Sequence, residues 1–260
     1  MKKAVLLEIE KNIAVIILNR PERYNAVNQD LVDGINESLS VVESDNNIRA
    51  VVLTGNGKGF CAGADMSVFG DEVSAEQRSE YIINEYQPLM KRFFSLKKPI
   101  IGAINGSAAG VGAAFALACD LRVMSKESAI LYAFVNIGLG PDGGASWLLA
   151  RQVGYSKALE IAISGKKVFG EECLSLGLTN RIVEKEDILV DAKKWAHELS
   201  IRPTLAIGIA KADIAYSLDN NLNDTIAFEA DQQISAFKSH DLKEGVTAFI
   251  QKRPAKFLGK

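Results

Sequence analysis

The sequence predicts a mixed α/β fold with a helical C-terminal region, and two observations lead to this prediction. A buried strand, a loop of small residues and a helix follow one another twice, first over residues 48–97 and again over residues 99–118. From Pro203 onward no segment has a strong strand pattern. We therefore expect an α/β core over residues 1–200 and a helical region over residues 201–260, without a flexible linker between them.

Hydrophobic periodicity predicts the elements in chain order. Two β-rich runs, 6–9 and 13–18, flank a polar turn and indicate a hairpin. An apolar stripe at helical spacing predicts a helix over 75–97, which Pro88 should kink. The other expected elements are helices over 28–44, 187–200 and 222–237, a helix ending near 118, a helix after 144, and strands over 48–54, 99–104, 121–124 and 129–132.

Composition excludes several classes of protein. The 260 residues are 48% hydrophobic and 24% charged, as in globular proteins, which excludes a disordered chain or a coiled coil. A net charge of −2 without a basic stripe disfavours nucleic-acid binding. Cys61, Cys119 and Cys173 have no metal-ligand or CxxC spacing, so we expect neither a metal site nor disulfides. Without a signal segment or an uninterrupted apolar span, we expect a soluble, cytoplasmic protein that does not contact a membrane.

Two loops of small residues follow buried strands. They are GNGKGFCAGAD at 55–65 and NGSAAGVG at 105–112. Small residues let backbone N–H groups approach a ligand closely, and one N–H from each loop could bind a single oxyanion or enolate oxygen. Tight turns and close helix–sheet packing explain the same glycines equally well. Both interpretations remain open on spacing alone.

Nucleotide-binding motifs and histidine chemistry find little support. The first loop lacks the spacing and the Ser/Thr of a Walker motif. In the second loop, Phe115 stands where a dinucleotide-binding motif needs its third glycine. The histidines, His197 and His240, lie far from both loops in the sequence and are expected at the surface or in packing. A His-based triad is therefore disfavoured.

Asp142 is the most informative carboxylate. Residues 100–150 contain three acidic side chains, and only Asp142 stands in an apolar segment, the turn GPDGG at 140–144. In an apolar pocket its pKa should rise above about 3.9, which would suit a proton shuttle. Turn formation or N-capping of the following helix would equally explain an aspartate at this position.

These segments together resemble the crotonase superfamily, the enoyl-CoA hydratase/isomerase family. The resemblance extends over nearly the whole chain, and its strength comes from the order and spacing of short motifs. The matching segments are NRPERYNA at 19–26, GFCAGAD at 59–65, KPIIGAING at 98–106, ACD at 118–120, IGLGPDGG at 137–144 and FIQKRPA at 249–255.

The resemblance implies a spiral of β-β-α units, a helical C-terminal trimerisation region, and an acyl-CoA thioester as substrate. It places the backbone N–H groups of Ala64 and Val111 at the two oxyanion-hole positions. Val111 departs from the glycine common there, so its branched side chain could crowd the acyl group. It also places Arg23, Ala62, Ala64, Asp65 and Met66 at positions that bind coenzyme A. We expect residues 66–85 to contribute to the acyl pocket.

The sharper departure concerns catalysis. Family hydratases use two glutamates, and their positions here carry Ala114 and Phe134. Ordinary hydration is therefore disfavoured. Asp142 instead matches the acidic position of family isomerases, including enoyl-CoA isomerases and the epoxide isomerase of phenylacetate breakdown. The resemblance thus favours a Δ3-Δ2-enoyl-CoA isomerase in which Asp142 is the one acid–base group.

Other readings of the resemblance remain. Asp142 could be the nucleophile of a dehalogenase-like enzyme, with Trp147 and Phe134 positioning an aromatic acyl group. An atypical hydratase is another alternative. A non-catalytic acyl-CoA-binding protein is a further alternative. Its limiting case is a structural trimer with an empty or blocked pocket, which a bulky side chain beside Val111 would favour. We expect no separate cofactor, since coenzyme A is part of the substrate, and a homotrimer or a dimer of trimers.

Overall fold

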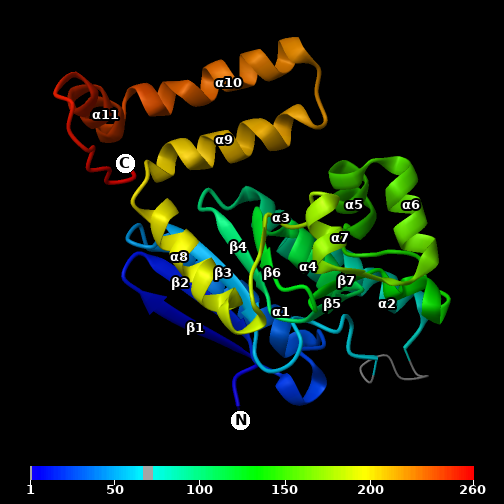
Figure 1. Ribbon diagram of the computed structural model, residues 1–260. Coiled ribbons are helices and arrows are strands. Elements are labelled where there is room, and N and C mark those ends of the chain that lie inside the picture. The colour runs from blue at the N-terminus through cyan, green and yellow to red at the C-terminus, as the bar shows by residue number, and fades with distance from the viewer. Residues whose placement is uncertain (1, 67–72) are drawn as a thin grey trace.

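The structure is a computed structural model that describes residues 2–66 and 73–260 (Figure 1). The described residues contain a six-stranded sheet in the order β1-β2-β3-β4-β6-β9. The hairpin predicted at the N-terminus is confirmed, because β1 pairs antiparallel with β2, and every later pair is parallel. The strands are β1 (Val5–Glu10), β2 (Ile13–Leu18), β3 (Ala50–Gly55), β4 (Ile100–Ile104), β6 (Leu121–Met124) and β9 (Arg181–Ile182).

Helices cover both faces of this sheet, which explains why β3 and β4 are buried at every position. One face packs against α1 (Gln29–Ser44), α3 (Gln87–Ser95) and α4 (Val111–Ala118) in the larger hydrophobic core. The other face packs against α8 (Ile188–Ser200) in a smaller core. The larger core includes residues of both small-residue loops, among them Cys61 and Val111.

A second, three-stranded sheet lies beside the first. It consists of β5 (Ser107–Ala109), β7 (Ala129–Leu131) and β8 (Lys167–Phe169), in the order β5-β7-β8. The expectation that residues 105–112 form only a loop is therefore wrong, since β5 lies within them. This strand has three residues and takes its hydrogen bonds from distant partners, so the local pattern gives no sign of it.

The helix predicted over 75–97 is interrupted. The chain forms α2 (Ala75–Tyr81), one π-helical turn η3 (Ile82–Tyr86) and then α3. Pro88 lies near the beginning of α3, where its missing N–H removes a hydrogen bond to the preceding turn. The disruption expected at Pro88 therefore takes the form of a π-turn just before it, and such turns are frequent at functional sites.

Helices and short elements complete the chain. The helices predicted after residue 144 and over 187–200 are confirmed as α5 (Ala145–Val153) and α8. No sequence pattern predicted α6 (Tyr155–Ser164), β8, α7 (Gly170–Ser175) or β9. From α9 (Thr204–Ser217) onward the chain is helical, with α10 (Leu222–Phe237) and α11 (His240–Ile250), and Figure 1 shows these three helices projecting from the core. Within the described ranges, no helix combines the length and apolar character needed to cross a bilayer.

Candidate active site

The first small-residue loop is fastened to the segment that follows β2. The N–H of Ala62 donates to the carbonyl of Tyr24 at 2.9 Å, and the N–H of Asp65 donates to the carbonyl of Val27 at 2.9 Å. Between them, the N–H of Ala64 has no acceptor in the described part of the chain. Ala64 itself is half-buried. The loop therefore presents one free backbone donor on a fixed segment.

The second loop presents another free donor for a different reason. Val111 is the first residue of α4, and the first N–H groups of a helix have no partner within the helix. Gly110 before it donates to the carbonyl of Leu131 at 3.0 Å, which anchors the loop to β7. No described residue accepts from the N–H of Val111. The positive end of the helix dipole adds to its affinity for a negative oxygen.

The two loops lie directly against each other. The N–H of Ala109 donates to the carbonyl of Cys61 at 2.8 Å, and Cys61 forms an isolated parallel bridge with Ala108. Glycine is needed for this approach: a Cβ on Gly63, whose φ is +95°, would lie 2.9 Å from the carbonyl oxygen of Ala109. A Cβ on Gly112 would lie 2.5 Å from the Cys61 carbonyl oxygen. The interpretation of the glycines as residues for close packing is therefore confirmed, and this packing brings together the two loops that carry the free N–H groups of Ala64 and Val111.

Asp142 lies beside the second loop. A Cβ on the next residue, Gly143, would lie only 2.9 Å from Cγ2 of Val111, so the Asp142 turn rests on the beginning of α4. The Oδ1 atom of Asp142 is buried and has no hydrogen-bond partner among the described residues. Burial raises the pKa of Asp142 to about 6, as the sequence predicted. The alternative of an N-cap is wrong, since Gly144 occupies the N-cap of α5 and no side chain caps it.

The two positions at which the resemblance places hydratase glutamates carry the hydrocarbon side chains of Ala114 and Phe134. Ala114 is fully buried and lies 3.8 Å from the Cβ position of Gly143. Phe134 is buried, with its ring 3.9 Å from the Cβ position of Gly110. The residue beside Val111 is thus a glycine rather than the bulky side chain that would favour a blocked pocket.

The other acidic residues of this stretch have different positions. Asp120 accepts from the backbone N–H of Ile100 at 2.8 Å and from Nζ of Lys211 at 2.9 Å, which makes it a structural carboxylate. Glu127 is exposed in the turn between β6 and β7. No group of three or more His, Cys, Asp or Glu side chains in the described ranges is arranged to hold a metal ion. Asp142 is the carboxylate of this stretch whose turn packs against the second loop, at Val111.

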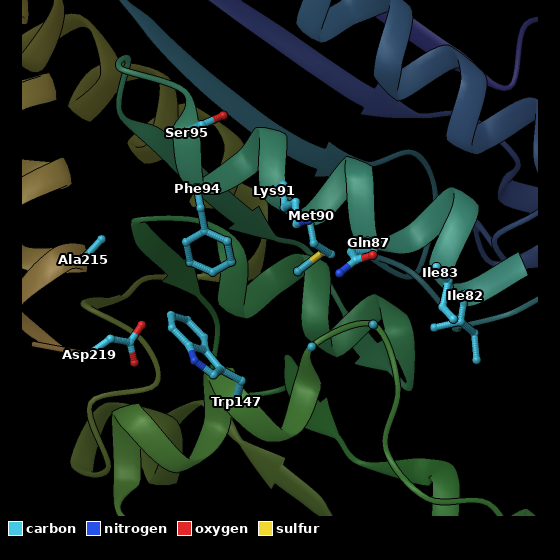
Figure 2. Close-up of a pocket in the computed structure, with 12 residues that line it drawn as sticks. Ile82, Ile83, Gln87, Met90, Lys91, Phe94, Ser95, Trp147, Ala215 and Asp219 are labelled. Carbon is cyan, nitrogen blue, oxygen red and sulfur yellow. The ribbon is translucent and has the colours of Figure 1, made fainter. Parts of the chain in front are cut away.

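A cavity of about 930 Å³ opens beside the Asp142 turn (Figure 2). Gly143 and Gly144 form part of its wall. Figure 2 shows Phe94 of α3 and Trp147 of α5 next to each other on one side, and their ring centroids are 5.3 Å apart in an edge-to-face arrangement. Trp147, which the sequence offered as an aromatic positioning residue, therefore lines this cavity, whereas Phe134 packs near Gly110.

The segment 66–85, expected to contribute to the acyl pocket, supplies part of the same wall. Ile82 and Ile83 line the cavity at the π-turn. Residues 67–72 lie outside the described residues.

Ala64, the half-buried donor described above, is one of the five positions expected to bind coenzyme A, and the other four fall into two groups. Arg23, Ala62 and Met66 are exposed near the first loop, where a large polar ligand could reach them. Asp65 is buried, and its carboxylate forms an ion pair with Arg20 at 2.8 Å. We infer that Asp65 positions the loop with its side chain and does not use its carboxylate to contact a ligand.

One polar side chain near Asp142 was not singled out from the sequence. Tyr86 belongs to the apolar stripe of the 75–97 segment, yet its buried hydroxyl has no partner among the described residues. It interacts electrostatically with Asp142 and Cys61. The available signal was a polar tip within a stripe otherwise made of hydrocarbon side chains.

Two adjacent backbone donors beside one carboxyl with a raised pKa define a site that can stabilise an enolate and move a proton. Comparison with known proteins identifies the family of the chain. The family model described as enoyl-CoA hydratase/isomerase matches residues 8–260. The chain therefore belongs to the enoyl-CoA hydratase/isomerase family, the crotonase superfamily.

Relatives within this family carry different activities. The chain is 36% identical over 262 residues to the 1,2-epoxyphenylacetyl-CoA isomerase of Escherichia coli, with 100% of each chain covered. It is 32% identical over 250 residues to the short-chain-enoyl-CoA hydratase of Clostridium acetobutylicum, covering 96% of this chain and 95% of the relative. A solved enoyl-CoA hydratase subunit I from Geobacillus kaustophilus superposes with a TM-score of 0.93 at 32% identity, covering 99% of this chain and 98% of that one. The predicted crotonase-like α/β fold is confirmed.

Proposed function

We propose that the protein is an acyl-CoA isomerase that uses Asp142 as its one acid–base group, with Δ3-Δ2-enoyl-CoA isomerisation as its main reaction. The observation that carries this proposal is the half-buried Asp142, whose Oδ1 is buried without a partner in the described residues and whose turn packs on Val111. The positions Ala114 and Phe134 supply no second carboxyl. One carboxyl is enough to move one proton between two carbons. Adding water requires further acid–base help, which these two positions do not supply.

The reaction would proceed in two proton transfers. Ionised Asp142 removes a proton from Cα of a 3-enoyl thioester, and the electron pair of the C–H bond enters a dienolate. The N–H groups of Ala64 and Val111 donate to the thioester oxygen as it becomes negative, and losing one such donor costs about 2.7–4 kcal/mol of transition-state stabilisation. Protonated Asp142 then returns the proton to Cγ, which leaves a conjugated 2-enoyl thioester. The proton and the electrons balance without a co-reactant.

The substrate would extend from the exposed edge of the first loop into the molecule. Arg23, Ala62 and Met66 lie on the exposed side, where coenzyme A would bind. The cavity that begins at Gly143 and ends near Trp147 would hold the acyl group.

The test incubates the purified protein with 3-hexenoyl-CoA in deuterated water. Absorbance follows the conjugated 2-enoyl product, and mass spectrometry follows deuterium uptake. We expect conversion by the wild-type protein and a loss of at least about 100-fold in Asp142→Ala, since a positioned acid–base group contributes about 10²–10⁴-fold. Glu127→Ala is the matched control, because it removes an exposed carboxylate from the same stretch, and it should retain full activity.

Two results would contradict the proposal. Isomerisation that persists in Asp142→Ala would remove Asp142 from its role. Binding of 3-hexenoyl-CoA by the wild-type protein without conversion or exchange would point to another acyl substrate or to a non-catalytic acyl-CoA-binding protein. Crotonyl-CoA assayed in parallel for water addition tests hydration, the activity in the names of several relatives.

A second candidate is isomerisation of an epoxidised aromatic acyl-CoA. It is favoured by the relative named for that activity, which matches over its full length at 36% identity. The aromatic side chains of Phe94 and Trp147 in the cavity wall suit a ring. This candidate predicts the same dependence on Asp142, and it wins if the epoxide turns over much faster than 3-hexenoyl-CoA.

We also propose that the protein is a homotrimer or a dimer of trimers assembled through α9–α11. Large apolar side chains are exposed on these helices, among them Leu222, Phe237, Phe249 and Ile250. Light scattering coupled to size exclusion checks the assembly, and a monomeric mass would contradict it. A cytoplasmic location agrees with three buried, unpaired cysteines.

A further inference from the structure

Two cavities of the molecule share a boundary. The cavity of about 930 Å³ beside the Asp142 turn and a second cavity of about 530 Å³ are both lined by Phe94, Trp147 and Ala215. Their other walls differ, since the second cavity continues along α5 to the C-terminal end of α4 and to one face of α9. The side chains of Phe94 and Trp147 therefore separate the space beside the proposed base from a further space along α5.

Contacts from three helical segments hold the ring of Trp147 at this boundary. The ring meets that of Phe94 edge to face, with the centroids 5.3 Å apart (Figure 2). The guanidinium carbon of Arg151, one helical turn later on α5, lies 4.0 Å from the centroid of the Trp147 ring. Arg151 also forms an ion pair with Asp219, which follows the end of α9. The aromatic contact, the cation–π contact and the ion pair together fix the ring between α3, α5 and α9.

The apolar end of an acyl chain beside Asp142 has two directions within the first cavity. Figure 2 shows Ile83 and the Phe94–Trp147 pair at opposite ends of the view. Ile83 is 57% exposed, whereas Phe94 and Trp147 are half-buried. Hydrocarbon is stabilised in proportion to the area that it removes from water, so the chain should extend toward the aromatic pair. Trp147 lies in the first turn of α5, directly after the Asp142 turn, so the chain meets its ring.

We propose that Phe94 and Trp147 are specificity-determining residues that limit the length of the acyl chain, because their rings end the cavity that holds it. The substrate class is an acyl-CoA thioester whose hydrocarbon chain ends at this aromatic pair. The second cavity becomes available to longer chains only when one of the two rings is removed. This inference rests on the proposed function, since it uses the same acyl cavity, and it agrees with a 3-enoyl thioester as the substrate.

The test measures the binding of saturated straight-chain thioesters, from butyryl-CoA to myristoyl-CoA, by calorimetry. For the wild-type protein, Kd should fall about fourfold per added methylene while the chain fills the cavity, and should stop falling at one chain length. In Trp147→Ala the fourfold steps should continue past this chain length, because the second cavity accepts the added carbons. Phe94→Ala opens the same boundary from α3 and should shift the limit in the same direction. An unchanged Kd for butyryl-CoA shows that each variant is folded.

Ile83→Ala is the matched control. It removes hydrocarbon from the other end of the same cavity, so the chain-length limit should stay where the wild-type protein has it. The inference is overturned if the wild-type affinity rises through the whole series without a limit, or if Trp147→Ala and Phe94→Ala both keep the wild-type limit. A limit that shifts only in Ile83→Ala also overturns it, because the chain would then extend toward the π-turn. Absent isomerisation of 3-hexenoyl-CoA, with the limit and its shift intact, would instead refute the proposed function alone.

Discussion

The polar groups at the two ends of α4 differ in whether they have hydrogen-bond partners. At the C-terminal end, Arg122 is buried and all of its nitrogens have partners: Nε donates to the carbonyl of Leu178 at 2.6 Å, Nη1 to that of Cys119 at 2.6 Å, and Nη2 to the side chain of Gln152 at 2.9 Å. At the N-terminal end, the N–H of Val111 has no acceptor among the described residues. We call the C-terminal end, where the buried polar groups are hydrogen-bonded, the closed end of α4. We call the N-terminal end, where the N–H of Val111 is free, the open end.

The difference separates stability from function. Burial lowers the pKa of Arg122 and raises that of Asp120, yet both are compensated by nearby charges and hydrogen bonds. At the open end, the pKa of Asp142 is raised by burial and no partner in the described residues offsets it. Buried polar groups without partners destabilise a fold. The N–H of Val111 and the Asp142 carboxyl are therefore expected to lack partners only where a bound ligand would supply them.

The largest expected effect on stability is at the closed end. Arg122→Met keeps the bulk of the side chain but leaves buried acceptors without donors. We expect the free energy of unfolding to fall by about 3–5 kcal/mol. Urea unfolding followed by tryptophan fluorescence measures it. Lys126→Met, which removes the exposed ion pair with Glu171, should unfold as the wild-type protein does. Wild-type stability in Arg122→Met would show that the closed end is not the structural one.

Asp142, at the open end, should make both the activity and the stability of the protein depend on pH. Because ionised Asp142 is the base and its pKa is about 6, kcat/KM should rise about tenfold per pH unit below 6 and level off above it. The stability follows the opposite direction. The folded state binds this proton more tightly than the unfolded state, so the contribution of Asp142 is present near pH 4 and is lost as pH rises through about 6.

Asp142→Asn supplies the reference for both measurements. Its activity should be low and should lack the rise near pH 6. Its free energy of unfolding, relative to the wild-type protein, should improve as pH increases from 5 to 7. A wild-type profile that is flat between pH 5 and 7 would mean that Asp142 titrates normally and that the open end is better solvated than its burial indicates.

The sequence predicted most of the long elements, with α6 missed, and the chemistry carried by local motifs. The small-residue loops, the raised pKa of Asp142 and the buried strands β3 and β4 all follow from residue types within a few positions. The short elements β5, β9 and α7 were missed, because strands of two or three residues and a helix of six depend on tertiary partners. Tyr86 was not recognised as a neighbour of Asp142 for a similar reason. It lies 56 positions before Asp142, and no periodicity encodes that proximity.

The smallest expected effect compares two buried tyrosines, one from each kind of environment. Tyr132 is 0% exposed and its hydroxyl donates to Ala145, so Tyr132→Phe should lower the free energy of unfolding by about 1 kcal/mol. Tyr86 is 1% exposed and its hydroxyl has no described partner, so Tyr86→Phe should leave stability unchanged or raise it slightly. Both substitutions remove one oxygen from a buried tyrosine. The difference between their free energies of unfolding therefore measures what the hydrogen bond of the Tyr132 hydroxyl contributes. Equal losses would mean that the Tyr86 hydroxyl is already hydrogen-bonded in the free protein, through a buried water.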